Sequence, residues 1–352
     1  MSMVVCGIDP HKSTLTAVTA DEVGRKLTQR TVPTRQESWF PLVVWARGQA
    51  EEVLWAIEDG RGLAGSLIRY LLAAGQRVVL VPPKLMARAR SSARTRGKSD
   101  PIDALAVARA ALREDDLPVA HLDQDALDIR LLVDHHDTLV TRRTATINRL
   151  RWHLHDLDPA LEAGTPALTT ARRQAALATH LHALPASVRR DLAAELLADI
   201  TALTGRIRDL GQRLDALVRP MAPTLLGLTG IGVLTAAKII GETGGVTRFP
   251  TSAVFAAHNG TAPIPIWTGN KPTFRLSRSG NRQLNAALHR MAITQLRRHP
   301  AARDYLDRYL KRRPHATRKA ALRALKRHLS DVVYTALKAD MTSTNNELPA
   351  AA

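Results

Sequence analysis

The stretch VVCGID occupies residues 4–9 of a chain of 352 residues, and it decides the fold of the N-terminal region. A run of apolar and small side chains closes on an aspartate, a pattern typical of a short buried strand that ends at a sheet edge. The β-rich stretches at residues 15–20 and 27–32 predict two more strands that pair beside the first as a meander. A β-sheet is therefore expected from the first residues of the chain.

Strands and helices then alternate along the sequence. Helical patterns cover residues 37–47 and 62–74, strand patterns cover residues 52–57 and 77–81, and a further helix is predicted to begin near Pro101. Alternation of this kind is typical of α/β domains. The N-terminal region is therefore expected to be an α/β domain.

A coiled coil is predicted between residues 116 and 220, where the strand patterns disappear. Apolar residues follow the spacing of a coiled-coil seam in two helical segments, joined by a connection at residues 159–185. The seam positions are Leu139, Ile147, Leu150, Leu154 and Leu157 in the first segment, and Leu196, Ile200, Leu203, Ile207, Leu210, Leu214 and Leu217 in the second. The pattern leaves open whether the seam closes within one chain or between two.

The C-terminal region is predicted to be mainly helical. Residues 225–244 read LLGLTGIGVLTAAKIIGETG, in which Gly230 and Gly232 interrupt two helical patterns. This predicts a helix-hairpin-helix, whose free backbone amides would hold a DNA phosphate, although a tight turn with a purely structural role fits equally well. A turn-rich stretch follows at residues 260–279. Two more helices are predicted at residues 281–298 and 317–338.

The composition is strongly basic, because 50 lysines and arginines against 32 aspartates and glutamates give a formal net charge of +18. A surplus of this size favours DNA or RNA as the partner, with a membrane surface as the rival. The sequence contains no apolar run long enough to span a bilayer and no secretory signal pattern, so a cytoplasmic protein is expected. The single cysteine, Cys6, excludes an internal disulfide and a cysteine-based zinc cluster.

Four acidic residues occupy positions that suit a metal site. Asp9 and Glu58 end buried strands, where a carboxylate needs a partner or a cation. Asp100 and Asp103 lie three residues apart at the start of a predicted helix, on one face. Converging carboxylates of this kind hold two Mg²⁺ ions, or Mn²⁺ in their place, about 4 Å apart for phosphoryl transfer. Taken singly, each acid also fits an ordinary helix-start or turn position.

Four motifs together resemble one family of mobile-element proteins. They are GIDPHK at residues 7–12, EDG at 58–60, GKSDPIDALAVA at 97–108 and NGTAPIPIWTGNKPTFRLSRSGNRQLNAALHRMA at 259–292. Their kind and order are similar to those of the DEDD transposases of insertion sequence 110 type. In this resemblance the family's four acids correspond to Asp9, Glu58, Asp100 and Asp103.

The resemblance implies an α/β ribonuclease H-like (RuvC-like) catalytic domain at residues 1–115 and a helical coiled-coil oligomerisation arm at 116–220. It also implies a mainly α C-terminal transposase domain at 221–340, and the polar tail at 341–352 is expected to be disordered. Members exchange DNA strands under the guidance of a structured noncoding RNA, the bridge RNA, which pairs with donor and target double-stranded DNA. Because two strands must be cut and exchanged, we expect a homodimer that assembles into a tetramer, without a membrane partner.

The same family places a nucleophilic serine directly before a glycine in its C-terminal domain. Here that position is Thr268, between Trp267 and Gly269. A threonine hydroxyl activated by metal ions is able to attack a DNA phosphate and hold the strand covalently, but its β-branch restricts χ1. The departure leaves three alternatives open: a threonine nucleophile, an inactive element, or a neighbouring hydroxyl such as Ser277 or Ser279.

Contacts with nucleic acid are expected from basic residues and glycines. The predicted set is Lys12, Arg88, Arg94, Arg96, Lys98, Gly230, Gly232, Lys271, Arg278 and Arg282. Lys12 and the adjacent His11 either touch a phosphate or solvate the strand end after Asp9.

Two rival functions remain. A RuvC-like structure-specific nuclease would use water and would cleave without Thr268. A catalytically inactive nucleic-acid-binding descendant would bind DNA or RNA without Mg²⁺-dependent cleavage. Only the four acids argue against the inactive protein, because simple phosphate binding does not call for carboxylates.

Overall fold

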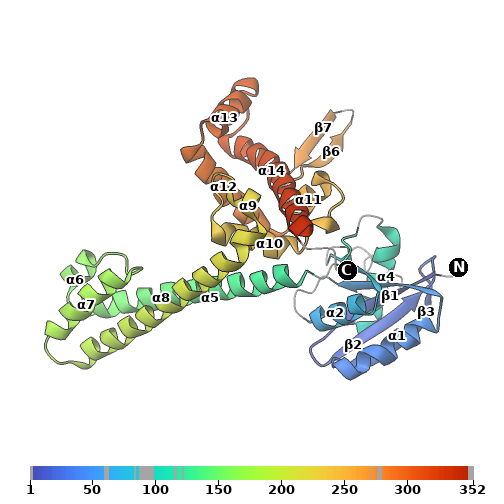
Figure 1. Ribbon diagram of the computed structural model, residues 1–352, viewed down its shortest axis with the longest axis horizontal. Helices are drawn as coiled ribbons and strands as arrows, with labels where there is room; N and C mark the ends of the chain where they lie inside the picture. Colours follow the sequence, from blue (N-terminus) through green and yellow to red (C-terminus); the bar gives the residue numbers. More distant parts are fainter. Residues whose placement is uncertain are drawn as a thin grey trace. The chain divides into compact units, whose positions relative to one another are not determined.

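The computed structural model describes residues 3–58, 63–82, 85–86, 99–114, 117–120, 123–269, 271–275 and 280–347 (Figure 1). Side chains are described at these positions except at residues 268, 271–273 and 343–347. The chain divides into two compact units. The first comprises Met1–Asp123 with Thr247–Pro250, and the second comprises Gln124–Val246 with Thr251–Ala352.

The first unit is built on a five-stranded mixed sheet. Its strands are β1 (Met3–Pro10), β2 (Thr14–Ala20), β3 (Lys26–Pro33), β4 (Glu52–Glu58) and β5 (Arg77–Val81), in the spatial order β3-β2-β1-β4-β5. The first three strands pair antiparallel as a meander, whereas β4 runs parallel to β1 and β5 runs parallel to β4. The predicted α/β character of the N-terminal region is confirmed, and each predicted strand is present.

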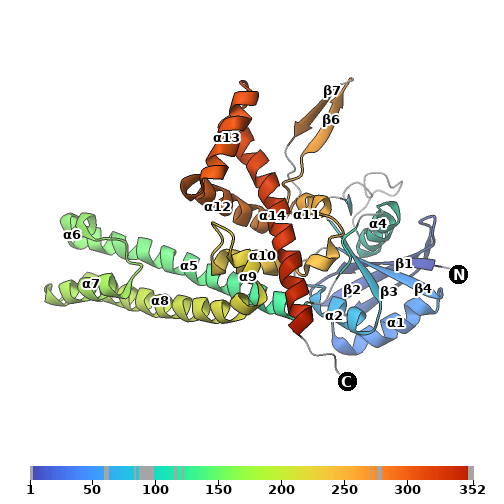
Figure 2. The ribbon, with the colours of Figure 1, turned by 45° about the horizontal axis from the view of Figure 1, so that its top comes forward.

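Helices cover both faces of this sheet. They are η1 (Gln36–Ser38), α1 (Trp39–Arg47), α2 (Gly65–Ala73) and α4 (Asp100–Arg113), close to the predicted ranges. Figure 2 shows α4 on one side of the sheet and α1 and α2 on the other. Cys6 and Ile8 belong to the core with α1 and α2, while Val5 packs with Val107 of α4. Burial on both faces explains why residues 4–8 are all apolar or small.

The second unit contains the predicted pair of long helices. α5 (Gln124–Leu157) and α8 (Val188–Met221) span 34 residues each and pack along one another (Figure 1). The predicted seam closes within one chain. Its buried positions are Leu139, Leu150 and Leu154 on α5, and Ile200, Leu210 and Leu214 on α8.

The segment between these two helices is itself helical. It forms α6 (Pro159–Gly164) and α7 (Ala171–Ala183), where the sequence predicted only a connection. Leu177 and Leu181 of α7 share a core with Leu150 and Leu154 of α5. The connection therefore folds back because its own leucines extend the same seam.

The rest of the second unit is mainly helical, as predicted. The remaining helices are α9 (Pro223–Leu226), α10 (Val233–Thr243), η2 (Val246–Arg248), α11 (Ser252–His258), α12 (Arg282–Arg298), α13 (Pro300–Arg312) and α14 (Arg318–Glu347). The turn-rich stretch contains an antiparallel hairpin of β6 (Ile264–Thr268) and β7 (Lys271–Arg275). α14 continues past residue 341, where the tail was expected to begin. Among the described residues, no helix is both long and apolar enough to cross a membrane.

The predicted helix-hairpin-helix corresponds to the short helix α9, a turn and α10. Gly230 lies in the turn with a φ of 92°, and a Cβ there would come within 3.0 Å of the Met291 carbonyl oxygen in α12. Gly232 precedes α10 and has open space around its Cα. Close packing therefore accounts for Gly230, while phosphate binding at this turn stays a prediction.

A buried lysine joins α10 to α5. The side chain of Lys238 is almost fully buried, and its Nζ lies 2.8 Å from Asp134 Oδ1 and 2.7 Å from Asp137 Oδ2. Burial lowers the pKa of Lys238, but hydrogen bonds to the two carboxylates outweigh burial and raise the pKa above its ordinary value. The two aspartate side chains are half exposed. The buried ammonium group of Lys238 therefore depends on the two carboxylates, whereas water can solvate the carboxylates without the lysine.

Removing both aspartates is expected to destabilise the protein more than removing the lysine. Asp134→Ala combined with Asp137→Ala leaves an uncompensated buried ammonium group, which costs about 3–5 kcal/mol. Lys238→Met keeps the volume and leaves carboxylates that water can solvate, so its cost stays below about 1.5 kcal/mol. Urea unfolding of the two variants beside wild type measures the difference, and a less stable Lys238→Met variant would contradict it.

Candidate active site

Gly7 allows α4 to pack directly on β1. A Cβ at this position would lie 2.1 Å from the Ala104 carbonyl oxygen and 2.6 Å from the Ala108 amide nitrogen, both backbone atoms of α4. Only glycine permits that approach. Because α4 begins at Asp100, the glycine of the GID motif brings the first turn of this helix to the end of β1.

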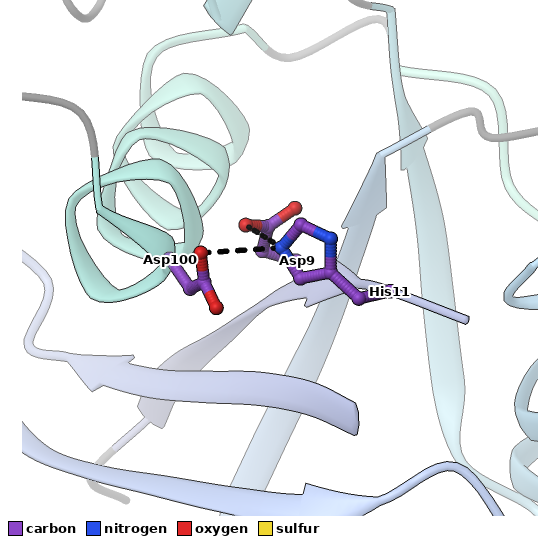
Figure 3. Close-up of side chains that lie close together, drawn as sticks. All are labelled: Asp9, His11 and Asp100. Atoms are coloured by element: carbon purple, nitrogen blue, oxygen red, sulfur yellow. Dashed lines mark ion pairs between the residues drawn. The ribbon is translucent and has the colours of Figure 1, made fainter. Parts of the chain in front are cut away.

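Three side chains of metal-ligand type meet where β1 ends and α4 begins (Figure 3). His11 Nε2 lies 3.3 Å from Asp9 Oδ2 and 3.3 Å from Asp100 Oδ1, so the imidazole bridges the two carboxylates. One ligand atom from each residue lies within 4.8 Å of the other two, and Glu58 and Asp103 lie outside this tight group. The Asp9 side chain is buried, whereas those of His11 and Asp100 are half exposed. The group is therefore open to solvent on one side.

Asp103, one turn further along α4, adds a buried carboxylate to this region. Burial raises the pKa of Asp9, His11 lowers it, and the negative charges of Asp103 and Asp100 raise it again. The net result is a pKa above the ordinary value for an aspartate. The end of β1 therefore carries more negative charge than the surrounding protein stabilises.

Glu58 ends β4 beside Asp9. In the parallel register Ile8 pairs with Ile57, so the next residues, Asp9 and Glu58, are level with one another. Ile8 and Ile57 belong to the core on the α1 and α2 side, and strand alternation turns both acids toward the α4 side. All four predicted acids therefore lie at one edge and on one face of the sheet.

His11 is the member of the group that the acid pattern did not single out. The sequence suggested only that it touches a phosphate or solvates the strand end. A signal was present, because residues two apart at the end of a strand face the same side and His11 follows Asp9 by two. A histidine two residues after an acid at the end of a strand is therefore expected on the same side as that acid.

The remaining predicted site residues lie in other parts of the chain. Thr268 is the last residue of β6 and pairs with Lys271, and Gly269 follows it with a φ of 64°. The side chains of Thr268 and Lys271 are outside the described part of the chain, while Lys12 and Arg282 are exposed. Outside the described residues lie Arg88, Arg94, Arg96, Lys98, Ser277, Arg278 and Ser279.

Gly7→Ala is expected to destabilise the first unit and to reduce DNA cleavage together. The added methyl group forces α4 away from β1, and overpacking of this kind costs about 1–3 kcal/mol or more. The shift also separates Asp100 from Asp9. Gly65→Ala in α2 is the matched control, because a Cβ there meets only the Arg69 side chain at 3.6 Å. Thermal unfolding and a cleavage assay test both effects. If the two variants behave equally, the close approach of α4 to Gly7 is not what holds the site together.

Two family models match the chain. One, a transposase model of the DEDD type from IS110 elements, matches residues 6–159. The other is described as a transposase of the IS116/IS110/IS902 family and matches residues 222–307. The first range includes the four acids, and the second includes Thr268.

Relatives align over almost the whole chain. The 44.8 kDa protein of insertion element IS116 from Streptomyces clavuligerus is 28% identical over 94% of this chain and 94% of its own length. The 42 kDa protein of insertion element IS900 from Mycobacterium paratuberculosis is 26% identical over 95% of this chain and 96% of its own.

A solved RuvC from T. thermophilus, in complex with a Holliday junction substrate, overlaps only weakly. It is 19% identical over 34% of this chain and 99% of RuvC, with a TM-score of 0.28, too low to carry a conclusion. The two family models, by contrast, span most of the chain in one order, and the relatives match it from end to end. The chain belongs to the IS110-type family of insertion-sequence transposases, and it is a DNA-cutting enzyme of that family.

Proposed function

We propose that this transposase is an RNA-guided DNA recombinase, in which the N-terminal acids bind a divalent cation and the Thr268 hydroxyl attacks a DNA phosphate. The observation that carries the metal site is the meeting of ligand atoms from Asp9, His11 and Asp100 within 4.8 Å. Glu58 and Asp103, on the same face of the sheet edge, complete the proposed set of ligands.

The donor atoms suit a small hard cation. Mg²⁺ and Mn²⁺ prefer carboxylate oxygens and retain water ligands, and the group at the end of β1 supplies carboxylates on a solvent-open side. A cation would also relieve the repulsion by which Asp103 and Asp100 raise the pKa of Asp9. When bound, it would stabilise the negative charge that develops on the phosphate and the leaving oxygen.

The protein's own side chains would divide the remaining work at this site. Buried Asp9 and Asp103 are held by β1 and α4, so they give the site its fixed part. Half-exposed Asp100 and His11 border the open side, where an incoming phosphate would arrive. Lys12 is exposed beside them and would contact a phosphate oxygen.

Thr268 is the proposed nucleophile because it occupies the position of the family's serine, directly before a glycine. It ends β6 directly before Gly269, whose positive φ turns the chain at this point. Its hydroxyl would lose a proton and its oxygen would form a bond to the scissile phosphorus, while the bond from that phosphorus to the strand oxygen breaks and the strand oxygen leaves with a proton. Trp267 is 68% exposed and would stack on a nucleotide beside the attacked phosphate.

The domain roles are proposals of the same kind. A ribonuclease H-like (RuvC-like) catalytic domain at residues 1–115 is supported by the meander followed by two parallel strands, with Asp9 on the central strand. Residues 116–220 would form the oligomerisation arm, and residues 221–340 the C-terminal transposase domain. Exposed apolar side chains on the arm, among them Trp152 and Val188, support its use in a dimer that assembles into a tetramer.

Guidance by RNA is proposed from the family resemblance and is compatible with the net charge of +18. A structured RNA transcribed from the element would pair with donor and target DNA, so that base pairing selects the sequence. The protein would then contact both nucleic acids mainly through phosphates.

A covalent-capture assay tests the proposal. Purified protein with its co-purifying RNA, Mg²⁺ and labelled DNA carrying candidate element ends is denatured and examined for a protein–DNA adduct. We expect an adduct that disappears with EDTA and with prior ribonuclease treatment. Cleavage without an adduct would favour a nuclease that uses water, and binding without cleavage would favour the inactive descendant.

A further inference from the structure

A basic cleft lies within the second unit, between the β6–β7 hairpin and the helices α13 and α14. It encloses about 1260 Å³, and every charged side chain that lines it is an arginine. The arginines are Arg275 of β7, Arg308 and Arg312 of α13, Arg313, and Arg323 and Arg327 of α14. We call this feature the arginine cleft.

The two helices present matching faces to the cleft. On α13 the lining residues are Tyr305, Arg308, Tyr309 and Arg312, and on α14 they are Ala320, Arg323, Ala324 and Arg327. Both sets follow the spacing i, i+3, i+4 and i+7, which places all four residues on one side of a helix. Each helix thus contributes two arginines, with tyrosines between them on one wall and small alanines on the other.

The charge of the arginine cleft is largely uncompensated. Its lining contains no carboxylate, and of its six arginines only Arg327 forms an ion pair with a described acid, Asp331. Cations gathered without acids repel one another unless an anion joins them. Their spread over two helices and a strand suits a chain of phosphates better than a single small anion.

The tyrosines supply flat apolar surfaces among these charges. The Arg313 guanidinium lies 4.5 Å from the centre of the Tyr309 ring, and Tyr305 stacks on His328 with an interplanar angle of 12°. Both tyrosines are half-buried. Phe274, which is 65% exposed, faces the cleft from β7. Aromatic rings alternating with guanidinium groups are the surfaces on which unpaired bases stack.

We propose that the arginine cleft binds an unpaired segment of the DNA strand that the transposase cuts. The unpaired state follows from the aromatic lining, because duplex DNA keeps the faces of its bases stacked inside. DNA, and not RNA, follows from the position of the hairpin, and this step rests on the proposed function. Arg275 in the cleft wall pairs with Ile264 of β6, the strand that ends four residues later at Thr268. That separation is about 14 Å, the length of a few nucleotides.

Binding in the absence of cleavage tests this inference. Fluorescence anisotropy in EDTA compares labelled single-stranded DNA, duplex DNA and single-stranded RNA of one sequence on the full chain. The charge variant is Arg308→Gln with Arg312→Gln. Its matched control, Arg298→Gln with Arg303→Gln, removes the same charge from exposed positions of α12 and α13 outside the cleft.

The charge variant is expected to lose about tenfold in affinity for single-stranded DNA. The slope of log affinity against log salt should become shallower by roughly 1.4, since each phosphate contact with a single strand contributes about 0.7. Tyr309→Leu should weaken binding by about fivefold or more, while Tyr309→Phe, which keeps the ring, should bind like wild type. The control pair should leave affinity and slope within about twofold of wild type.

Three results would overturn the inference: equal losses in the charge variant and its control, a loss on duplex DNA as large as on single strands, or a loss on RNA alone. The outcome is separate from that of the covalent-capture assay. If the adduct depends on Thr268 but the charge variant binds DNA like wild type, the inference that the arginine cleft binds DNA is refuted and the proposed function stands. Binding that depends on the cleft without any adduct refutes the proposed function alone.

Discussion

Asp9→Asn is expected to reduce Mg²⁺-dependent DNA cleavage by more than about a hundredfold. Loss of a residue that only supports a metal ligand costs up to about a hundredfold, and Asp9 is proposed as a ligand itself. Asp9 is the buried carboxylate of the group at the end of β1, and an amide keeps its shape but not its charge. The same change is expected to leave the cation-free protein as stable as wild type or more so. It removes a buried charge that Asp100 and Asp103 repel.

The direction of the pH dependence follows from the pKa shift of Asp9. Burial raises its pKa, and the Asp103 and Asp100 carboxylates add to that effect beyond what His11 offsets. A folded-state pKa above the unfolded value means that the native protein binds this proton more tightly. The contribution of Asp9 to stability therefore falls as pH rises from the unfolded pKa of about 4 through the raised folded pKa. The Asp9→Asn variant has no carboxylate at this position, so its stability should not show this decrease with rising pH.

Urea unfolding in EDTA, from about pH 4 to about pH 8, measures the effect in wild type and Asp9→Asn. Mg²⁺ added in excess over the EDTA should then stabilise wild type and not the variant, because only the native wild type is expected to bind the ion. Glu51→Gln, at an exposed acid of the same unit, is the control and should respond like wild type. An Asp9→Asn variant that Mg²⁺ stabilises as much as wild type would show that the cation binds elsewhere.

The strands of the sheet and the acids at strand ends and at a helix start were predictable because they depend on local signals. Buried strands such as β1 are apolar throughout, and a carboxylate at the end of such a strand or at a helix start is visible without tertiary information. Asp9, Glu58, Asp100 and Asp103 could therefore be singled out as candidate ligands, but periodicity alone could not show that they converge. The close approach that Gly7 allows between α4 and β1 could not be read, because it depends on the backbone of another element.

Elements of the second unit were missed where charge or turn residues masked the periodicity. The β6–β7 hairpin carries Pro265 and Pro272 inside its strands, which weakens the strand pattern, although Gly269 and the next residue form a typical two-residue hairpin signal. In α13 the many charged residues weaken the apolar pattern, so the helical spacing of Tyr305 and Tyr309 did not lead to a predicted helix. The arginine cleft arises where these two missed elements meet α14, a helix that the sequence did predict.

Thr268→Ala is expected to abolish the covalent protein–DNA adduct, because alanine has no oxygen with which to attack phosphorus. Thr268→Ser keeps the hydroxyl and removes the β-branch that restricts χ1, so in-line attack becomes easier and adduct formation should equal wild type or exceed it by up to about tenfold. Labelled DNA on denaturing gels reports adduct and cleavage in the same lanes. Ser277→Ala and Ser279→Ala, which remove the alternative hydroxyls, are the controls and should both retain the adduct.

Each departure from this pattern identifies a different enzyme. An adduct that survives Thr268→Ala and disappears in one of the serine variants moves the nucleophile to that serine. Cleavage that survives Thr268→Ala without any adduct means that water attacks, as in the rival nuclease. An inactive wild type that gains activity on Thr268→Ser marks an element disabled at its nucleophile, and the added methyl group is then the reason, since the two side chains differ in nothing else.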